Sequence, residues 1–290
     1  GEYTGRLNYK LIICPEQIGA IFLLYRKVHM ARFCSLFSSS SGNCTYIGSS
    51  SGGVLIDAGV SAKQISLKLS GIGVSEKDIG AVFVTHEHSD HVKGLRVFAS
   101  KYNIPVYATE GTIRELEKMG IINGKFPVFP IGSGIECNGQ LVVPFRTSHD
   151  VAESCGYSVT TSDDRKICVA TDTGIVTGEM RAALTGCDLA LVESNHDIGM
   201  LRNGSYPYLL KRRILSDVGH LSNIACGDFV TELVKSGTTR LVLGHLSKEN
   251  NIPSLAYRTS KSALDCMGAT ENRDYILKVA GSEEPEMAVL

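Results

Sequence analysis

Seven consecutive residues of the sequence, THEHSDH, carry four side chains of the kinds that bind metal ions in proteins. They are His86, His88, Asp90 and His91, and they follow directly on the apolar run AVFV. Ligands at positions i, i+2, i+4 and i+5 of a turn can fan out from one backbone, so that the first two histidines point one way and the aspartate and last histidine the other. Two neighbouring cations need this arrangement, and imidazole nitrogen with carboxylate oxygen suits zinc, manganese or iron. A purely structural role would require a separate partner for each polar group at a buried strand end.

Four residues cannot close two metal sites, and single candidates follow three other apolar runs. His149 comes after LVVPF, Asp172 after KICVA, and His245 after RLVL. The carboxyl ends of parallel strands are where an α/β sheet collects its functional groups. A lone histidine or aspartate at such a point is usually structural, but three of them in a chain that carries THEHSDH predict one shared site.

The elements that would position these residues alternate between strands and helices from Met30 to about Val279. Apolar runs predict strands at residues 53–59, 81–84, 104–108, 141–145, 189–194, 240–245 and 274–279, and GYSVTT with KICVAT predicts a hairpin around the turn SDDR. Helical spacing predicts helices at 61–69, 92–102, 111–120, 223–237 and 253–267. Ser61 and Gln64 occupy the N-cap and capping-box positions of the first helix. Pro144 restricts its strand to a sheet edge or its own end.

Composition limits the class of protein. The chain has 290 residues, of which 43% are hydrophobic and 20% charged, as in packed globular proteins. Its net charge of -1 provides no global attraction to nucleic acid, so any polyanion must be held by a local patch or by metal. Nine cysteines without a CxxC pair favour a reduced, cytoplasmic protein with buried thiols.

The N-terminal segment is predicted to stand apart from the rest. Residues 1–29 are interpreted as an N-terminal extension or cloning remnant, and residues 30–290 as a single domain. The apolar run Ile18–Tyr25 is shorter than the about 20 residues that span a bilayer, so no membrane partner is expected, and a helix on a membrane surface is the alternative.

The ordered set formed by HEHSDH, His149, Asp172 and His245 resembles the metallo-β-lactamase superfamily, over about Met30 to Val279. The resemblance implies an α/β fold, a four-layer αββα sandwich with a dinuclear metal site at one edge of its two sheets. It also implies the ligand sets: His86, His88 and His149 for one metal, Asp90, His91 and His245 for the other, and Asp172 as a bridge.

Further segments resemble one family within that superfamily, the YycJ/WalJ proteins. They are SSSSGNCTYI, LIDAGVSAKQ, VESNHDIGML, YPYLLKRRILSDVGHLSN and LGHLSKENN. These bacterial proteins are often encoded beside a cell-wall two-component regulator and are regarded as metal-dependent nucleases acting on DNA. The resemblance implies a phosphodiesterase, a DNA exonuclease of 5′→3′ polarity, with two divalent metal ions, Zn or Mn. Residues 1–29 depart from the pattern, because the family starts near Met30.

The chemistry follows from two cations held about 3.5–4 Å apart, which share a water, lower its pKa and supply a bridging hydroxide as in-line nucleophile. The leaving oxygen still needs a proton, and His220 in VGHLSN is the candidate. Related tRNA-processing nucleases of the superfamily use a histidine in the corresponding place as general acid, so the resemblance assigns His220 this role, supported by Asp90 or Glu193. A helix-capping or core histidine is the alternative. Asp57 in LIDAG is expected to brace the ligand turn without binding metal.

Candidates for substrate contacts lie in three segments. Lys211, Arg212 and Arg213 precede His220, and arginines can grip phosphates bidentately. The alternative for this basic run is a solvated charged face.

The other two candidate segments carry hydroxyl, amide or imidazole groups. Ser41 and Asn43, in SSSSGN, belong to a turn that could present backbone N–H groups to a phosphate. His196 in ESNHD could contact substrate or orient a ligand. A structural turn and a structural histidine are the respective alternatives.

Two other functions use the same residues. A small-substrate acyl hydrolase, a thioesterase or lactonase, would share the metal site but would not need His220 or the basic segment. A non-catalytic regulatory partner of a cell-wall two-component system is disfavoured, because all seven expected ligands are present. The sequence leaves open metal identity, DNA versus RNA, cleavage polarity and whether the chain forms a homo-oligomer.

Overall fold

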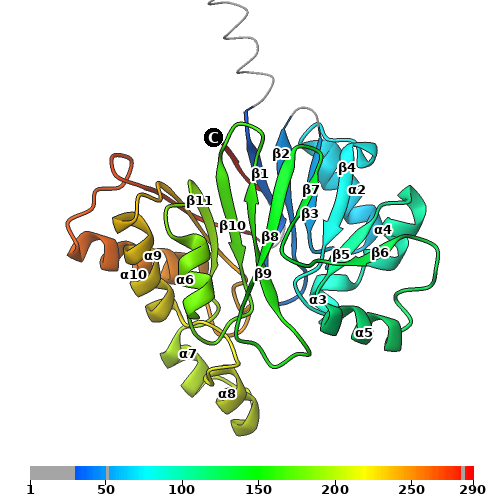
Figure 1. Cartoon of the computed structure of the whole chain (residues 1–290). Coiled ribbons are helices and arrows are strands. Elements are labelled where there is room, and N and C mark those ends of the chain that lie inside the picture. Colours follow the sequence, from blue (N-terminus) through cyan, green and yellow to red (C-terminus); the bar gives the residue numbers. More distant parts are fainter. Residues whose placement is uncertain (1–29, 50–51, 282–284) are drawn as a thin grey trace, which may run out of the picture.

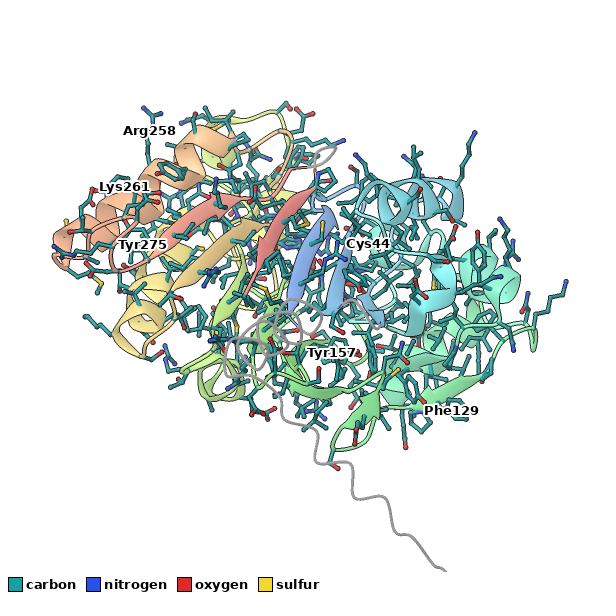
Figure 2. All side chains as sticks on the ribbon, turned by 90° about the horizontal axis from the view of Figure 1, so that it is seen from above. Cys44, Phe129, Tyr157, Arg258, Lys261 and Tyr275 are labelled. Atoms are coloured by element: carbon teal, nitrogen blue, oxygen red, sulfur yellow. The ribbon has the colours of Figure 1, made fainter. Side chains whose placement is uncertain are left out.

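The computed structural model describes residues 30–49, 52–281 and 285–290. Two seven-stranded sheets lie face to face, and helices cover the outer side of each (Figure 1). Seen from above, the sheets form the middle of the molecule with helices on both flanks (Figure 2). This arrangement confirms the predicted αββα sandwich. The prediction for residues 1–29 lies outside the described residues.

The first sheet joins both ends of the described chain. Its spatial order is β14 (Glu286–Val289), β1 (Arg32–Phe37), β2 (Cys44–Ser49), β3 (Gly52–Ile56), β4 (Ile79–Phe83), β5 (Val106–Ala108) and β6 (Val128–Pro130). β14, β1, β2 and β3 are antiparallel neighbours, whereas β3 to β6 run parallel. The accompanying helices are α2 (Ala62–Gly71), the 3-10 turn η1 (Glu76–Asp78), α3 (Ser89–Val92), α4 (Leu95–Tyr102) and α5 (Glu110–Lys118).

The second sheet contains most of the strand ends at which metal ligands are predicted. Its order is β13 (Ile276–Val279), β12 (Arg240–Gly244), β11 (Leu189–Glu193), β10 (Lys166–Ala170), β9 (Cys155–Thr160), β8 (Gln140–Arg146) and β7 (Ile135–Cys137). β10 to β13 run parallel, and β9 is antiparallel to both β10 and β8, which confirms the predicted hairpin. Its helices are α6 (Gly178–Leu184), α7 (Ile198–Asn203), α8 (Tyr208–Ile214), α9 (Asn223–Lys235) and α10 (Pro253–Cys266).

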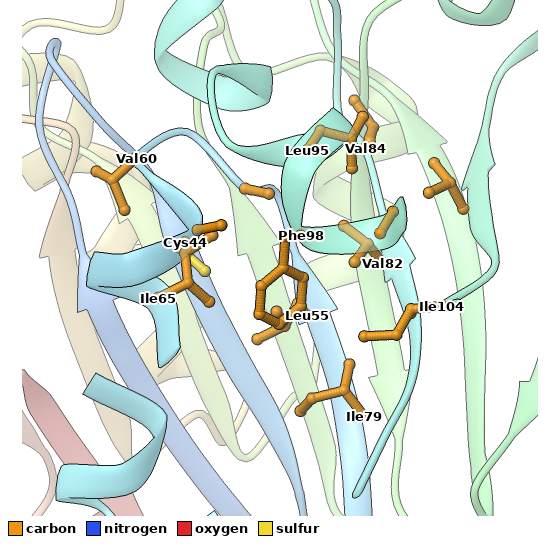
Figure 3. Close-up of a cluster of buried hydrophobic side chains, with 14 of the residues drawn as sticks. Cys44, Leu55, Val60, Ile65, Ile79, Val82, Val84, Leu95, Phe98 and Ile104 are labelled. Atoms are coloured by element: carbon orange, nitrogen blue, oxygen red, sulfur yellow. The ribbon is translucent and has the colours of Figure 1, made fainter. Parts of the chain in front are cut away.

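Alternating side chains explain why each sheet is buried on both faces. Successive residues of a strand point to opposite faces. In the first sheet, Leu55 and Val82 pack under the helices, whereas Val54 and Phe83 pack between the sheets. Figure 3 shows the helix-side cluster, in which Phe98 of α4 lies close to Leu55. Strands covered on both sides need apolar residues at nearly every position, which is why the sequence shows short unbroken apolar runs.

Local signals agree with the structure at two further places. The Ser61 hydroxyl accepts a hydrogen bond from Gln64 N, and Gln64 Oε1 accepts one from Ser61 N, so α2 begins with the predicted capping box. β7 pairs with Gln140–Val142 only, so β8 is locally an edge at Pro144, as the missing N–H requires.

Strand direction brings the predicted site residues to one edge of the sandwich. The carboxyl ends of β1, β3 and β4 lie at the same edge as those of β8, β10, β11 and β12. Within each sheet these strands run in one direction, because β1 and β3 are both antiparallel to β2, and β8 and β10 are both antiparallel to β9. In Figure 1 this edge carries α3, α7 and α8 and lies opposite the C-terminus. Within the part of the chain that the structure describes, no helix has the length and apolar character needed to cross a bilayer.

Candidate active site

The turn after β4 holds its ligands through a buried carboxylate on the neighbouring strand end. Asp57 follows β3, and its two oxygens accept hydrogen bonds from Thr85 N at 2.8 Å and Thr85 Oγ1 at 2.9 Å. His91 Nδ1 donates to Asp57 Oδ2 at 2.7 Å. This contact directs His91 Nε2 toward the edge between the sheets, where it could bind metal. Asp57 therefore braces the ligand turn, as predicted.

The same turn lies against a glycine with no space for a side chain. A Cβ built at Gly59 would overlap the carbonyl oxygen of Asp90. Asn43 N donates to that oxygen at 2.8 Å, and Gly59 N donates to the carbonyl oxygen of Asn43. Three segments of backbone thus meet at the ligand turn, which fixes its position in the fold.

His149 reaches the turn from the second sheet. Its Nδ1 donates to the carbonyl oxygen of Gly219 at 3.0 Å, which leaves Nε2 directed at the centre of the site. That Nε2 lies 3.3 Å from His88 Nδ1 and 3.9 Å from Asp172 Oδ1. The bonded ring nitrogen fixes the orientation of the free one, as is common for metal-binding histidines.

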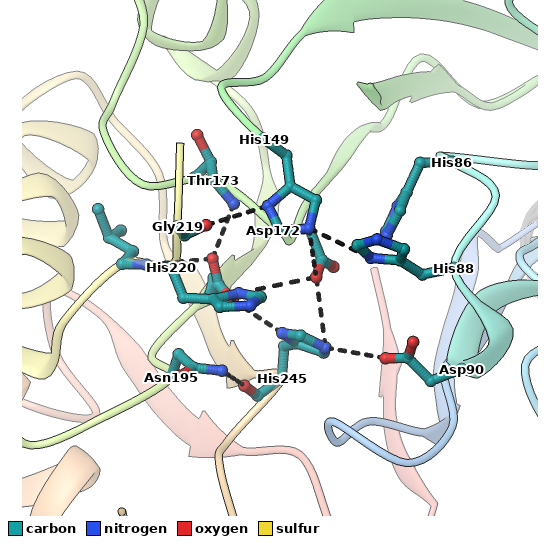
Figure 4. A network of polar contacts seen from close by, with 12 residues as sticks. His86, His88, Asp90, His149, Asp172, Thr173, Asn195, Gly219, His220 and His245 are labelled. Carbon is teal, nitrogen blue, oxygen red and sulfur yellow. Dashed lines mark hydrogen bonds and ion pairs between the residues drawn. The ribbon is translucent and has the colours of Figure 1, made fainter. Parts of the chain in front are cut away.

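Asp172 lies between the two groups of ligands (Figure 4). Its Oδ2 is 3.2 Å from His91 Nε2, and its Oδ1 is 3.5 Å from His245 Nε2. A carboxylate in this position can serve two cations with different oxygens. Asp172 therefore lies in contact with one predicted ligand from each sheet.

Glu193, the last residue of β11, organises the second-sheet side. It is 0% exposed, and its Oε1 accepts hydrogen bonds from His245 Nδ1 at 2.7 Å and His220 Nδ1 at 2.8 Å. Its Oε2 accepts from the backbone N–H groups of Thr173 and Leu221. The sequence predicts Glu193 only as support for His220. Its place at the end of the LALVE strand was the available signal for this larger role.

Three site residues adopt left-handed backbone conformations. The φ angles are 64° for Asp57, 56° for Asp172 and 54° for His245. Side chains other than glycine rarely adopt this region, and such strain concentrates at functional sites. Each residue comes directly after a strand or within two residues of its end, so the sharp bend turns its side chain into the edge.

Candidate ligand atoms form four groups, and within each group the atoms lie within 4.8 Å of one another. Two of these groups are the predicted triads. The four are His86, His88 and His149; Asp90, His91 and His245; His86, His91 and Asp172; and Asp172, Glu193, His220 and His245. Because the groups share members, they form one continuous cluster.

The unpaired atoms of this cluster fit a divalent cation. Among the described residues, His86 Nε2 is buried without a hydrogen-bond partner, and buried Asp172 Oδ2 has only the 3.2 Å ion-pair contact with His91 Nε2. Buried polar atoms almost always have a partner, so these two atoms point to a missing one. A donor set of imidazole nitrogens and carboxylate oxygens is the set that zinc and manganese accept.

Charge in the cluster raises the pKa of two ligand histidines. Burial lowers the pKa of His245, but Asp172, Asp90 and Glu193 outweigh it and raise the pKa to about 10. The carboxylates of Asp172 and Asp57 likewise hold the pKa of His91 well above its usual value against the effect of burial. A ligand must lose its proton to bind metal, so protons and cations compete for these rings.

His220 lies beside the cluster with one ring nitrogen uncommitted. Its side chain is 17% exposed, and its Nδ1 lies 3.7 Å from Asp172 Oδ1 in addition to the bond with Glu193. Burial lowers its pKa, but the Glu193 carboxylate outweighs this and raises the pKa above the usual value. Of the two carboxylates expected to support His220, Glu193 makes the contact, and Asp90 contacts His245 instead, at 3.4 Å.

The predicted basic segment forms α8, beside the site, and two of its three cations have partners within the protein. Arg213 forms a bidentate ion pair with Asp150. Lys211 Nζ donates to the carbonyl oxygens of Arg202 and Gly204. Arg212 lies over the ring of Tyr208, 5.9 Å from its centroid.

The three remaining predicted contact residues differ in exposure. Ser41 is exposed, whereas Asn43 is buried and its Nδ2 lies 3.1 Å from His91 Nε2. His196 is buried, and neither of its ring nitrogens has a hydrogen-bond partner within the part of the chain that the structure describes. Burial lowers its pKa to about 4, so the ring is neutral near pH 7. Only Ser41 of these three is open to a ligand from solvent.

Known proteins match both the fold and the motifs. A family model described as the beta-lactamase superfamily domain matches residues 53–246. Solved structures share the fold at low identity. They include the metallo-beta-lactamase fold protein YhfI from Bacillus subtilis, with a TM-score of 0.67, 15% identity and coverage of 89% of this chain and 100% of that one. Human tRNase Z, short form, has a TM-score of 0.59 and 17% identity, and the match covers 88% of this chain and 98% of that one. The chain therefore belongs to the beta-lactamase superfamily.

Sequence relatives confirm the more specific resemblance. Exodeoxyribonuclease YycJ of Bacillus anthracis is 38% identical over 239 residues, which are 81% of this chain and 90% of that protein. Exodeoxyribonuclease WalJ of Streptococcus pneumoniae is 38% identical over 237 residues, 80% and 88% respectively. With this family and this ligand cluster, the chain is a metal-dependent hydrolase that binds divalent cations.

Proposed function

We propose that the protein is a phosphodiesterase, specifically a DNA exonuclease of 5′→3′ polarity, that works with two divalent ions, zinc or manganese. The observation that carries the proposal is the convergence of seven predicted ligands, from four separate strand ends, on one cluster that also contains His220. The names of the 38% identical relatives, both exodeoxyribonucleases, support DNA as the substrate.

We assign the ligands as two triads that share Asp172. His86, His88 and His149 hold one cation, and Asp90, His91 and His245 hold the other. When bound, the cations activate a water as the nucleophile and neutralise charge on the phosphate oxygens. Asp57 and Glu193 keep the free nitrogens of His91 and His245 directed at the site.

His220 protonates the leaving oxygen. Its Nδ1–H is held by Glu193, so only Nε2 is available to a substrate. The same carboxylate stabilises the charged ring, which keeps a proton ready for transfer. A positioned acid of this kind contributes about 10²–10⁴-fold to rate.

The substrate contacts are assigned to Lys211, Arg212, Arg213, His196, Ser41 and Asn43, as the sequence predicts. Arg212 and Ser41 are exposed and suit direct contact with phosphate. Arg213 would have to exchange its pair with Asp150 for a phosphate, and Lys211 its two carbonyl oxygens. Asn43 and His196 are buried, so they act through the ligand turn and the site wall.

We also propose a cytoplasmic location and a chain that works without a membrane. The described cysteines, eight in number, are all free thiols, which suits a reducing compartment. A DNA substrate supports the same location. A single domain over residues 30–290 and the oligomeric state remain predictions.

The test is product mapping with the metal-loaded protein. It is incubated with end-labelled single- and double-stranded DNA and RNA, and in parallel with a thioester and a lactone. The proposal expects mononucleotides released from the 5′ end of DNA. Turnover of the thioester or lactone with intact DNA would replace the nuclease with an acyl hydrolase. Loss of DNA cleavage after chelation, with recovery on adding zinc or manganese, identifies the metal requirement.

A further inference from the structure

A basic groove adjoins the candidate metal cluster on the first-sheet side. It has a volume of about 350 Å³, and its polar lining is Ser39, Ser41, Gln64, Lys68, Lys93 and Lys248. We call it the lysine groove. No carboxylate lines it among the described residues. Phe37 and Val60 supply an apolar floor.

The three lysines come from different parts of the fold. Lys68 is on α2, Lys93 directly follows α3, and Lys248 follows β12. Local sequence does not explain why three cations from positions so far apart meet in one groove. In the part of the chain that the structure describes, Lys93 and Lys248 are exposed and have no ion-pair partner. Their charges are therefore available to a ligand, unlike those of Arg213 and Lys211.

Two lysines of the groove are close in the chain to ligands assigned to the second cation. Lys93 is two residues from His91 and Lys248 is three from His245, so their Cα atoms lie at most about 7 Å and 11 Å from those of the ligands. Asn43, which follows the serine turn of the groove, contacts His91 Nε2. A ligand in the groove is thus next to the metal cluster.

A cavity on another side of the site has the opposite charge. Its volume is about 370 Å³, and three glutamates line it: Glu110, Glu153 and Glu179. Arg146, the one cation in its lining, is paired with Glu153 at 3.2 Å. A polyanion would be repelled from this cavity, whereas the lysine groove would attract one.

We propose that the lysine groove binds a phosphate group of the substrate strand next to the phosphate that is hydrolysed. The proposal rests on the proposed phosphodiesterase function and adds a binding site to it. Lysine ammonium groups bind phosphate as point charges, and the hydrogen-bonded hydroxyl pair of Ser39 and Ser41, 2.9 Å apart, has one O–H left to donate to its oxygens. The phosphate is either the terminal one or an internal one of the strand, and both present negatively charged phosphate oxygens.

The test uses a variant with Lys68, Lys93 and Lys248 all replaced by Gln. The matched control replaces Lys77, Lys125 and Lys235, which are exposed and precede β4, β6 and β12 at the opposite edge of the sheets. Both variants lose the same charge, so a non-specific effect of net charge would appear in both. Affinity is measured by fluorescence anisotropy on the metal-loaded protein, with a single strand of phosphorothioate linkages that resist hydrolysis.

We expect the groove variant to bind this strand at least about tenfold more weakly, with a salt slope smaller by about 0.7 for each lost phosphate contact. The control variant should stay within about twofold of the unsubstituted protein. Hydrolysis of bis(p-nitrophenyl) phosphate, which has no neighbouring phosphate, should keep its kcat in the groove variant. Equal affinity and equal salt slope in the two variants would overturn the proposal.

The same experiment separates this inference from the proposed function. If neither DNA nor bis(p-nitrophenyl) phosphate is hydrolysed, the phosphodiesterase proposal fails, whereas the binding result still decides on the groove. Strands with a 5′-phosphate and a 5′-hydroxyl distinguish the two sources. If the groove variant loses more affinity for the 5′-phosphorylated strand than for the 5′-hydroxyl strand, the groove binds the terminal phosphate. Equal losses of affinity assign it to an internal phosphate.

Discussion

The two sheets supply the candidate metal site in different ways. The first-sheet half, defined by His86, His88, Asp90 and His91, comes from a single turn after β4. The second-sheet half, defined by His149, Asp172 and His245, comes from three strand ends that only the fold brings together. The backbone of one turn sets the relative positions of the ligands on it. The relative positions of dispersed ligands depend on the register of every strand between them.

The carboxylates behind the two halves differ accordingly. Asp57 holds one ligand ring, that of His91, together with Thr85. Glu193 holds both His245 and His220, so in the proposed function it would join metal binding to proton transfer. The second-sheet half is therefore expected to be the more sensitive to substitution.

The largest effect is expected for Asp172, because its two carboxylate oxygens lie close to ligands of both halves. Asp172→Ala should lower kcat for DNA by at least about 10³-fold, since it removes a carboxylate shared by two cations. His196→Ala serves as the comparison and should cost less, because His196 lies outside every group of ligand atoms. Similar residual rates in the two variants would contradict the bridging assignment.

His220 tests proton transfer apart from metal binding. His220→Ala should lower kcat for DNA by about 10²–10⁴-fold and leave bound metal unchanged. Bis(p-nitrophenyl) phosphate has a leaving group that needs no proton, so its hydrolysis should fall by less than about tenfold. An equal loss on both substrates would show that His220 acts through the metals rather than on the leaving oxygen.

Glu193→Gln tests whether one carboxylate joins the two roles. The amide keeps the shape but loses the charge that holds His220 and His245, so both metal affinity and kcat should fall, by about 10–100-fold each. Metal content by elemental analysis and rates at saturating metal separate the two effects. A normal kcat of Glu193→Gln at saturating metal would show that Glu193 does not connect metal binding with proton transfer.

Asp57→Asn should have the smallest effect. It weakens the orientation of His91 alone, so we expect about tenfold lower metal affinity with kcat nearly restored at high metal concentration. Titration with zinc or manganese, followed by activity, measures this. A loss of kcat as large as that of Glu193→Gln would mean that the two halves of the site are equally sensitive.

Much of the fold could be predicted because its signals are local. The capping box of α2, the hairpin of β9 and β10, and the strands that end at the ligands all appear as patterns within a few residues. The ligand turn is the strongest such signal. The second-sheet ligands could be predicted because each follows an apolar run at a carboxyl end.

Other features depend on contacts between distant residues. β14 pairs with β1 across almost the whole chain, and neither strand was among the predicted ones, since RFCSLF and EMAV are short and mixed in polarity. The pairing of Arg213 with Asp150 and the four partners of Glu193 are likewise invisible in local patterns. The lysine groove was missed for the same reason, because its lysines are distant in sequence.

The close approach of Gly59 to the Asp90 carbonyl has a consequence for how such a site can change. Since main chain meets main chain there, backbone contacts set the position of the turn that carries Asp90 and His91. Substitution of a single ligand side chain could therefore change the metal preference while the backbone of the turn stays the same. A methyl group at position 59, in contrast, would displace Asp90 and His91 together and alter the spacing for every metal at once.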